Sequence, residues 1–401
     1  MTAETTAYMI VKGGRALLPG ADDFQTADIV VQGGRIAQIG PDLSAPDGAQ
    51  VIDATGKLVT PGLVDFHMHA FRYGHFLSID ADEVAHRSGT TTFVDAGSAG
   101  SLHFMAFREY VIKPAQANIL AFLHVSAIGQ TTDGCRGLEF HDSSNDALLH
   151  VESAREVIEK NRDYIVGVKV RAYTGLPSML SMQRARELAD MVNLPIMVHL
   201  APAPPTFQEV IAYLKEGDII THPYHGGETT ILDDTGKIRP EYWEARERGI
   251  EVDLGLDRFH GNLDIMRRCF DQGFYPDYLS TDLTTTNIDN IVFDMPTTIE
   301  KAVACGMPLP EAIRRSSATA AAKLSRADEI GNLKVGASAD IAIFDLETTP
   351  GRMVDFDMNE MATDQRLRAV ATYRAGRRMV PPTETMETLD VLNRSNPWAN
   401  Y

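Results

Sequence analysis

The chain has little cysteine, no long apolar run and no excess of positive charge. Its 401 residues include three cysteines, Cys135, Cys269 and Cys305, which lie far apart and form no C-x-x-C pair. This scarcity argues against a disulfide framework and against a zinc site built from thiolates. A reducing cytoplasm is the expected location.

No stretch approaches the apolar length that spans a bilayer, and residues 1–20 lack a basic region followed by an apolar core. We therefore expect neither a membrane span nor a signal peptide. Asp and Glu number 55 against 37 Lys and Arg, which gives a net charge of -18. This charge disfavours nucleic acid and anionic membranes as partners. If the substrate is an anion, a metal ion or an arginine must supply positive charge locally.

Both ends of the chain have the texture of short strands joined by glycine turns. Residues 8–59 alternate apolar runs with Gly13-Gly14 and Gly33-Gly34, and residues 331–381 repeat the pattern at 341–344 and 369–373. The pattern predicts one small β-sandwich built from residues 1–60 and 326–381. Residues 382–401 then form a C-terminal tail.

The middle of the chain, residues 61–325, alternates strand-like runs with amphipathic helical stretches. The strand candidates are 62–67, 91–96, 119–125, 164–170, 195–200, 218–222, 250–254 and 278–282. Eight β-α alternations predict an α/β fold of the (β/α)8 TIM barrel type. A doubly wound open sheet is the rival, but no G-x-G-x-x-G follows the first strand and the strand count favours closure.

The first of these strands ends in two histidines, His67 and His69. Side chains alternate across a strand, so both imidazoles point the same way and can chelate one metal ion. Paired histidines also occur in ordinary strands. The Pro61-Gly62 turn before the strand and Asp65 within it favour the functional interpretation.

Active sites of such barrels lie at the carboxyl ends of the strands. Four further ligand-type residues end or occupy predicted strands: Lys169, His199, His222 and Asp282. Each taken singly has an ordinary explanation, such as a snorkelling lysine, a core histidine or a helix cap. Their coincidence with the histidine pair at one mouth favours a metal site. Asp95 and His124 end other strands and are weaker candidates.

This arrangement resembles the amidohydrolase superfamily over nearly the whole chain. The resemblance implies two divalent metal ions, with His67 and His69 on the more buried ion and His199 and His222 on the outer one. It also implies a carboxylated Lys169 as bridging ligand and Asp282 as both metal ligand and catalytic proton carrier. Zinc is the default, with manganese and iron open. A homo-oligomer is implied by the resemblance alone.

Residues 82–100, Phe107-Arg108-Glu109-Tyr110, 167–171 and 279–283 resemble the deacetylase-type branch, whose members hydrolyse acetyl esters of hydroxy acids or N-acetyl amino acids. The expectation is a hydrolase that cleaves an acyl amide or ester of a small carboxylate-bearing substrate through a metal-bridged hydroxide. The alternatives are a cyclic amidohydrolase, similar to dihydroorotase or hydantoinase, and a non-catalytic amidohydrolase-like assembly protein. One departure from the branch is residues 255–260, where a Gly-His-Gly-like turn is expected.

Two further residues are candidates for substrate binding. Arg171 follows Lys169 by two positions, so it shares a strand face and could bind a substrate carboxylate, although a salt bridge in the barrel wall is equally compatible. His225 lies in the loop after His222 and could contact substrate or replace His222 as ligand. The remaining histidines, at positions 75, 86, 103, 124, 141, 150 and 260, are interpreted as structural or exposed.

Overall fold

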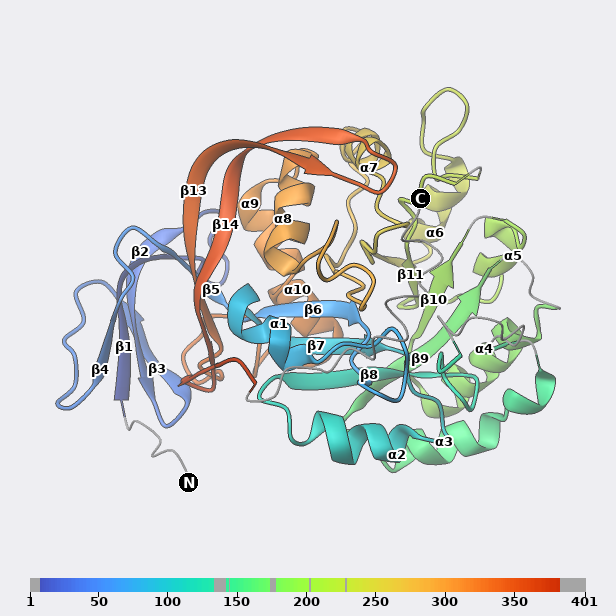
Figure 1. Cartoon of the computed structure of the whole chain (residues 1–401), viewed down its shortest axis with the longest axis horizontal. Helices are drawn as coiled ribbons and strands as arrows, with labels where there is room; N and C mark the ends of the chain where they lie inside the picture. The colour runs from blue at the N-terminus through green and yellow to red at the C-terminus, as the bar shows by residue number, and fades with distance from the viewer. Residues whose placement is uncertain are drawn as a thin grey trace.

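The computed structural model describes residues 8–132, 142, 143, 145–173, 178–201, 203–227 and 229–382. Two sheets organise them, a parallel sheet from the middle of the chain and a mixed sheet from both of its ends (Figure 1). The expected tail lies outside the described residues from position 383 onward, as does Cys135.

The parallel sheet contains seven strands within the described residues, and each pairs with the next along the chain. They are β6 (Leu63–Met68), β7 (Thr90–Ala96), β8 (Asn118–His124), β9 (Ile165–Ala172), β10 (Ile196–Leu200), β11 (Ile219–Thr221) and β12 (Glu251–Asp253). This sequential order is that of a barrel, because a doubly wound sheet reverses its strand order at a switch point.

The eighth expected strand, at 278–282, is reduced to single parallel bridges. Tyr278 pairs with Asp253 at the end of β12, and Leu283 pairs with Met68 at the end of β6. The segment therefore joins both edges of the seven-stranded sheet and brings the ring close to closure. The barrel class is confirmed, with its last strand shortened.

The α-helices lie mainly between the barrel strands. They are α1 (Ala81–Ser88), α2 (Phe104–Phe107), α3 (Val151–Glu159), α4 (Leu180–Val192), α5 (Phe207–Ile211), α6 (Pro240–Glu247), α7 (Leu263–Phe270), α8 (Met295–Ala304), α9 (Leu309–Arg315) and α10 (Ala318–Lys323). Local chemistry sets their ends: α1 begins at Asp80, whose side chain accepts from the Asp82 amide, and stops at Gly89 with φ +75°. No described helix has the length and apolarity needed to cross a membrane.

The second sheet joins residues from both ends of the chain, which confirms the predicted β domain. Its path is β15-β14-β13-β5-β1-β2-β3, with β4 paired to β1. The strands are β1 (Tyr8–Ala16), β2 (Gln25–Gln32), β3 (Arg35–Gly40), β4 (Gln50–Asp53), β5 (Leu58–Pro61), β13 (Ile341–Val354), β14 (Glu360–Arg374) and β15 (Arg377–Arg378). Strand β5 leads directly into β6, so the sheet is continuous in sequence with the first barrel strand.

The hairpin formed by β13 and β14 is much longer than the sequence indicates. Only 341–344 and 369–373 are expected as strands, yet the hairpin extends away from the sheet and arches over the barrel toward α7 (Figure 1). At its turn the Asp355 carboxylate accepts a hydrogen bond of 2.7 Å from the Leu263 amide. The polar, exposed outer half is thus supported by a loop far away in the sequence, which explains why local patterning does not reveal it.

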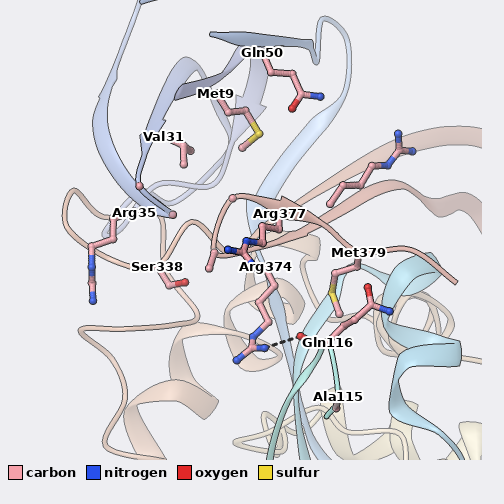
Figure 2. Close-up of a pocket in the computed structure, with 15 residues that line it drawn as sticks. Met9, Val31, Arg35, Gln50, Ala115, Gln116, Ser338, Arg374, Arg377 and Met379 are labelled. Carbon is pink, nitrogen blue, oxygen red and sulfur yellow. Dashed lines mark hydrogen bonds between the residues drawn. The ribbon is translucent and has the colours of Figure 1, made fainter. Parts of the chain in front are cut away.

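A cavity of about 820 Å³ lies where the mixed sheet meets the edge of the barrel (Figure 2). Arg374 crosses this junction and donates a hydrogen bond of 2.6 Å to the carbonyl oxygen of Gln116. The described lining of the cavity holds no histidine, carboxylate or cysteine. This cavity lies at the junction between the mixed sheet and the barrel, apart from the histidines at the ends of the barrel strands.

Candidate metal centre

The ends of β6 and of the shortened eighth strand are tied together by a buried carboxylate and by a backbone hydrogen bond. Asp65 is fully buried and accepts hydrogen bonds from the Thr281 amide (3.0 Å) and hydroxyl (2.6 Å). Burial raises the pKa of Asp65 to about 7. The Asp282 amide then donates to the carbonyl oxygen of His67 at 2.7 Å. These bonds place the Asp282 carboxylate beside the histidines of β6.

Three imidazoles converge on the Asp282 carboxylate. Nε2 of His67 and Nε2 of His69 each lie 3.3 Å from its Oδ1, and Nε2 of His222 lies 3.6 Å from its Oδ2. Burial would raise the pKa of Asp282, but the surrounding imidazoles hold it well below its usual value. The carboxylate is therefore ionised.

The other ring nitrogen of each histidine is already held. Nδ1 of His67 lies 3.0 Å from Asp253 Oδ2, Nδ1 of His69 lies 2.8 Å from Ser98 Oγ, and Nδ1 of His222 lies 2.7 Å from the carbonyl oxygen of Gly255. Metal-bound histidines characteristically have their second nitrogen fixed in this way. Nε2 of His222 is buried and has no hydrogen-bond partner among the residues that the structure describes. The donor set therefore fits a metal ion.

Lys169 and His199 lie beside the same cluster of histidines. Lys169 is buried on β9, with Nζ 3.5 Å from Nε2 of His67, and burial lowers its pKa to about 8. The ring centroids of His199, at the end of β10, and His222 are 4.5 Å apart. Burial, reinforced by neighbouring cationic groups, holds the pKa of both histidines well below the usual value, so both are neutral at pH 7, as ligation requires.

A glycine makes room for Lys169. Gly97 follows β7 with φ +90°, and a Cβ atom there would lie 2.6 Å from Cγ and 2.7 Å from Cβ of Lys169. Any side chain at position 97 would displace the lysine stem. The backbone of the neighbouring loop is fixed by Asp95, whose Oδ1 accepts from the amides of Gly97 and Ser98. Its Oδ2 accepts from the Ala70 amide at 2.8 Å, so both oxygens of Asp95 hold the backbone beside the site.

The structure adds two residues that the sequence patterns miss. Possible ligand atoms form two groups within the described residues, His67-His69-Asp282 and His222-His260-Asp282. His260, interpreted from sequence as structural or exposed, has its ring centroid 4.3 Å from that of His222. It lies in a loop beyond β12, so the strand-end criterion could not find it. Asp253 does end a strand, so the same criterion could have found the carboxylate that supports His67.

The two residues expected to bind substrate have local partners. Arg171 Nε lies 2.8 Å from Asp142 Oδ2, and its guanidinium carbon lies 5.0 Å from the ring centroid of Tyr173. His225 is buried, which lowers its pKa to about 4, and its Nδ1 accepts from the Gly227 amide at 3.2 Å. His225 borders a cavity of about 210 Å³ that Leu200 also lines. Their roles toward substrate stay predictions.

The chain is similar to a known protein family and to individual relatives within it. Residues 58–377 match the model of the amidohydrolase family, so the chain belongs to that family. Within it the chain resembles the deacetylase branch: it is 34% identical over 335 residues to Deacetylase Atu3266 of Agrobacterium fabrum, covering 82% of this chain and 80% of the relative. A protein of Brucella anthropi named deacetylase is 32% identical over 330 residues, covering 80% of each chain.

A solved structure described as a dihydroorotase has the same fold. It superposes with a TM-score of 0.84 at 28% identity, covering 93% of this chain and 99% of the other. The shared fold includes the barrel and the mixed sheet, since nearly all of both chains is matched. Family and relatives together define a hydrolase of the amide or ester type.

Proposed function

We propose that this protein is a metal-dependent, deacetylase-like hydrolase that cleaves an acyl amide or ester of a small carboxylate-bearing molecule. The observation that supports this most is the convergence of His67, His69 and His222 on Asp282, each with its Nδ1 held by a partner. Divalent ions in such a site act as Lewis acids and make water nucleophilic near neutral pH.

Two groups of side chains would hold two ions. His67 and His69 would bind one of them, and His222 with His199 the other, with His260 as an added candidate on that side. Lys169, carboxylated on Nζ by carbon dioxide, would supply the bridging ligand that the family resemblance implies. Zinc, manganese and iron all suit imidazole and carboxylate ligands.

Asp282 would carry the proton. Its carboxylate is ionised, so it can accept a proton from the attacking water and return it to the leaving amine or alkoxide. The backbone at Asp282 has φ +51°, and Asn287 donates a hydrogen bond of 2.8 Å to its carbonyl oxygen. This contact keeps the carboxylate oriented toward the histidines.

A cyclic amidohydrolase is the second candidate, supported by the likeness to the dihydroorotase structure. A hydrolysis screen over N-acetyl-D- and N-acetyl-L-amino acids, acetoxy acids and cyclic ureides separates the two. We expect turnover of an acetyl substrate. Turnover of the cyclic ureides alone would overturn the proposal, and purified protein that binds no metal under metal-replete conditions would favour a non-catalytic role.

A further inference from the structure

The loop after β12, residues 255–262, carries a buried arginine. Arg258 is 7% exposed. Its guanidinium carbon lies 4.4 Å from the ring centroid of Phe259 and 5.6 Å from that of Phe356, which lies in the turn of the β13–β14 hairpin. The two rings also contact each other, with centroids 4.5 Å apart. The guanidinium is therefore flanked by aromatic rings from two separate segments.

No carboxylate in the described part of the chain forms an ion pair with Arg258, although the adjacent Asp257 favours its charge through space. Arg258 makes no hydrogen bond there either, and its Nε is buried without a partner. The adjacent carboxylate, Asp257, is engaged elsewhere: Oδ1 accepts from Asn287 Nδ2 at 2.9 Å and Oδ2 lies 3.0 Å from His260 Nδ1. Arginine stays charged in proteins, and a buried charge without a partner is costly. An anion from outside the chain would relieve that cost.

Arg171, the other arginine considered for substrate binding, already has a carboxylate partner. Arg171 is neutralised by Asp142, with 2.8 Å between Nε and Oδ2. A substrate carboxylate at Arg171 would have to compete with a carboxylate of the chain itself. Among the described residues, no carboxylate is paired with Arg258 in this way.

The loop of Arg258 also borders the candidate metal centre. His260, two positions further on, has its ring centroid 4.3 Å from that of His222 and 5.0 Å from that of His199. Asp257, one position before Arg258, holds His260 through Nδ1. A molecule that reaches these histidines therefore lies next to the Arg258 loop.

The β13–β14 hairpin fixes this loop from above. Asp355 accepts from the Leu263 amide and Asp357 from the Asn262 side chain, both at 2.7 Å. These bonds hold Phe356 against Phe259, and Figure 1 shows the hairpin reaching across the barrel to α7. A guanidinium held in place before binding loses little freedom when an anion arrives, which favours affinity.

We propose that Arg258 is the residue that recognises the carboxylate of the substrate, clamped in position by Phe259 and by Phe356 of the hairpin. The inference deepens the proposed acyl hydrolase function and rests on it. The guanidinium can form paired hydrogen bonds to a carboxylate, which a neutral amide cannot match. The substrate class is thus an acylated molecule with a free carboxylate, such as an N-acyl amino acid.

The test compares an acid with its neutral amide. Kinetics are measured on both enantiomers of N-acetylalanine and of N-acetylalaninamide for the wild type and for Arg258→Met, which keeps an apolar stem without the charge. We expect kcat/KM for the acid to fall by roughly 10- to 100-fold, mainly through KM, in line with charge-assisted hydrogen bonds. The amide should change by no more than about 3-fold.

Three further variants sharpen the result. Arg258→Lys keeps charge but loses paired geometry, so its preference for the acid should be intermediate. Arg352→Met, an exposed position on β13, is the matched control and should behave as wild type. Arg171→Met should retain the preference. Equal loss on acid and amide in Arg258→Met, no loss at all, or loss of the preference in Arg171→Met alone would each overturn the inference.

A binding measurement separates this inference from the proposed function. Calorimetry with N-(methylsulfonyl)alanine and its carboxamide, which cannot be hydrolysed, reports recognition without turnover. If the wild type cleaves no acyl substrate, the proposed function fails, while acid-selective binding lost in Arg258→Met still supports the role of Arg258. Identical binding of the acid by wild type and variant overturns it. Metal content and melting temperature identify a misfolded variant, in which case Arg258→Lys decides.

Discussion

Replacing Asp253 by asparagine tests how the chain prepares its candidate metal ligands. Asp253 is completely buried, and its Oδ2 lies 3.0 Å from Nδ1 of His67. It also accepts hydrogen bonds from the hydroxyls of Thr221 (2.7 Å) and Ser280 (2.6 Å). With the imidazole proton kept on Nδ1 by this carboxylate, Nε2 of His67 has its lone pair free for a metal ion.

Asparagine preserves the size of this side chain but removes its charge. Loss of such a partner lowers metal affinity by about 10- to 100-fold, which corresponds to about 1.4 to 2.7 kcal/mol. We expect Asp253→Asn to bind zinc more weakly in competition with a chromogenic chelator, and excess zinc to restore most of the activity. Asp364→Asn, exposed on β14, is the control. Zinc affinity equal to wild type in Asp253→Asn would refute the argument.

Three other predictions concern single side chains. Asp282→Asn should keep most bound metal yet lower kcat by about 100- to 10,000-fold, and a wild-type kcat would exclude its proton role. Gly97→Ala should reduce metal content and activity, because the added methyl group displaces Lys169. The control is Gly336→Ala, which has a similar φ of +93° but no neighbouring atom in its way, so it should lower stability without lowering activity. Equal effects of the two variants on activity would refute the steric argument. Burial lowers the pKa of Lys301 to about 8 from 10.5, so folding loses stability as pH falls from about 10.5 to 8. The free energy of unfolding in urea should therefore be higher in Lys301→Met than in wild type by up to about 3 kcal/mol at pH 7. This difference should shrink toward pH 10.5, and a difference that does not depend on pH would contradict the prediction.

Most of the barrel could be predicted because its strands are short, apolar and bounded by polar turns. The expected runs at 91–96 and 195–200 correspond closely to β7 and β10. The segment 278–282 has the same composition but forms only bridges, because the Thr281 amide donates to the Asp65 carboxylate and not to a neighbouring strand. The outer half of the β13–β14 hairpin escaped prediction because its stabilising partners, Leu263 and Asn262, lie 92 and 95 residues away in the sequence.

Some residues of the candidate site could also be predicted from the sequence, and others could not. Residues that end a strand, such as His67 and His222, could be proposed because the barrel brings all strand ends to one mouth. His260 and Arg258 lie in an irregular loop with Asp257 at φ +37°, where neither periodicity nor strand position carries information. Their importance becomes visible only through contacts with other segments, namely the ring of His222 and that of Phe356.

We expect hydrolysis of an acyl substrate to require metal held by the cluster of His67, His69, His222 and Asp282. The direct measurement is to strip the protein with a chelator, follow hydrolysis of the best acetyl substrate, and add zinc or manganese in known amounts. Activity should disappear on stripping and return in proportion to added metal, with its maximum near two equivalents per chain. Undiminished turnover by protein shown by elemental analysis to be metal-free would contradict this expectation.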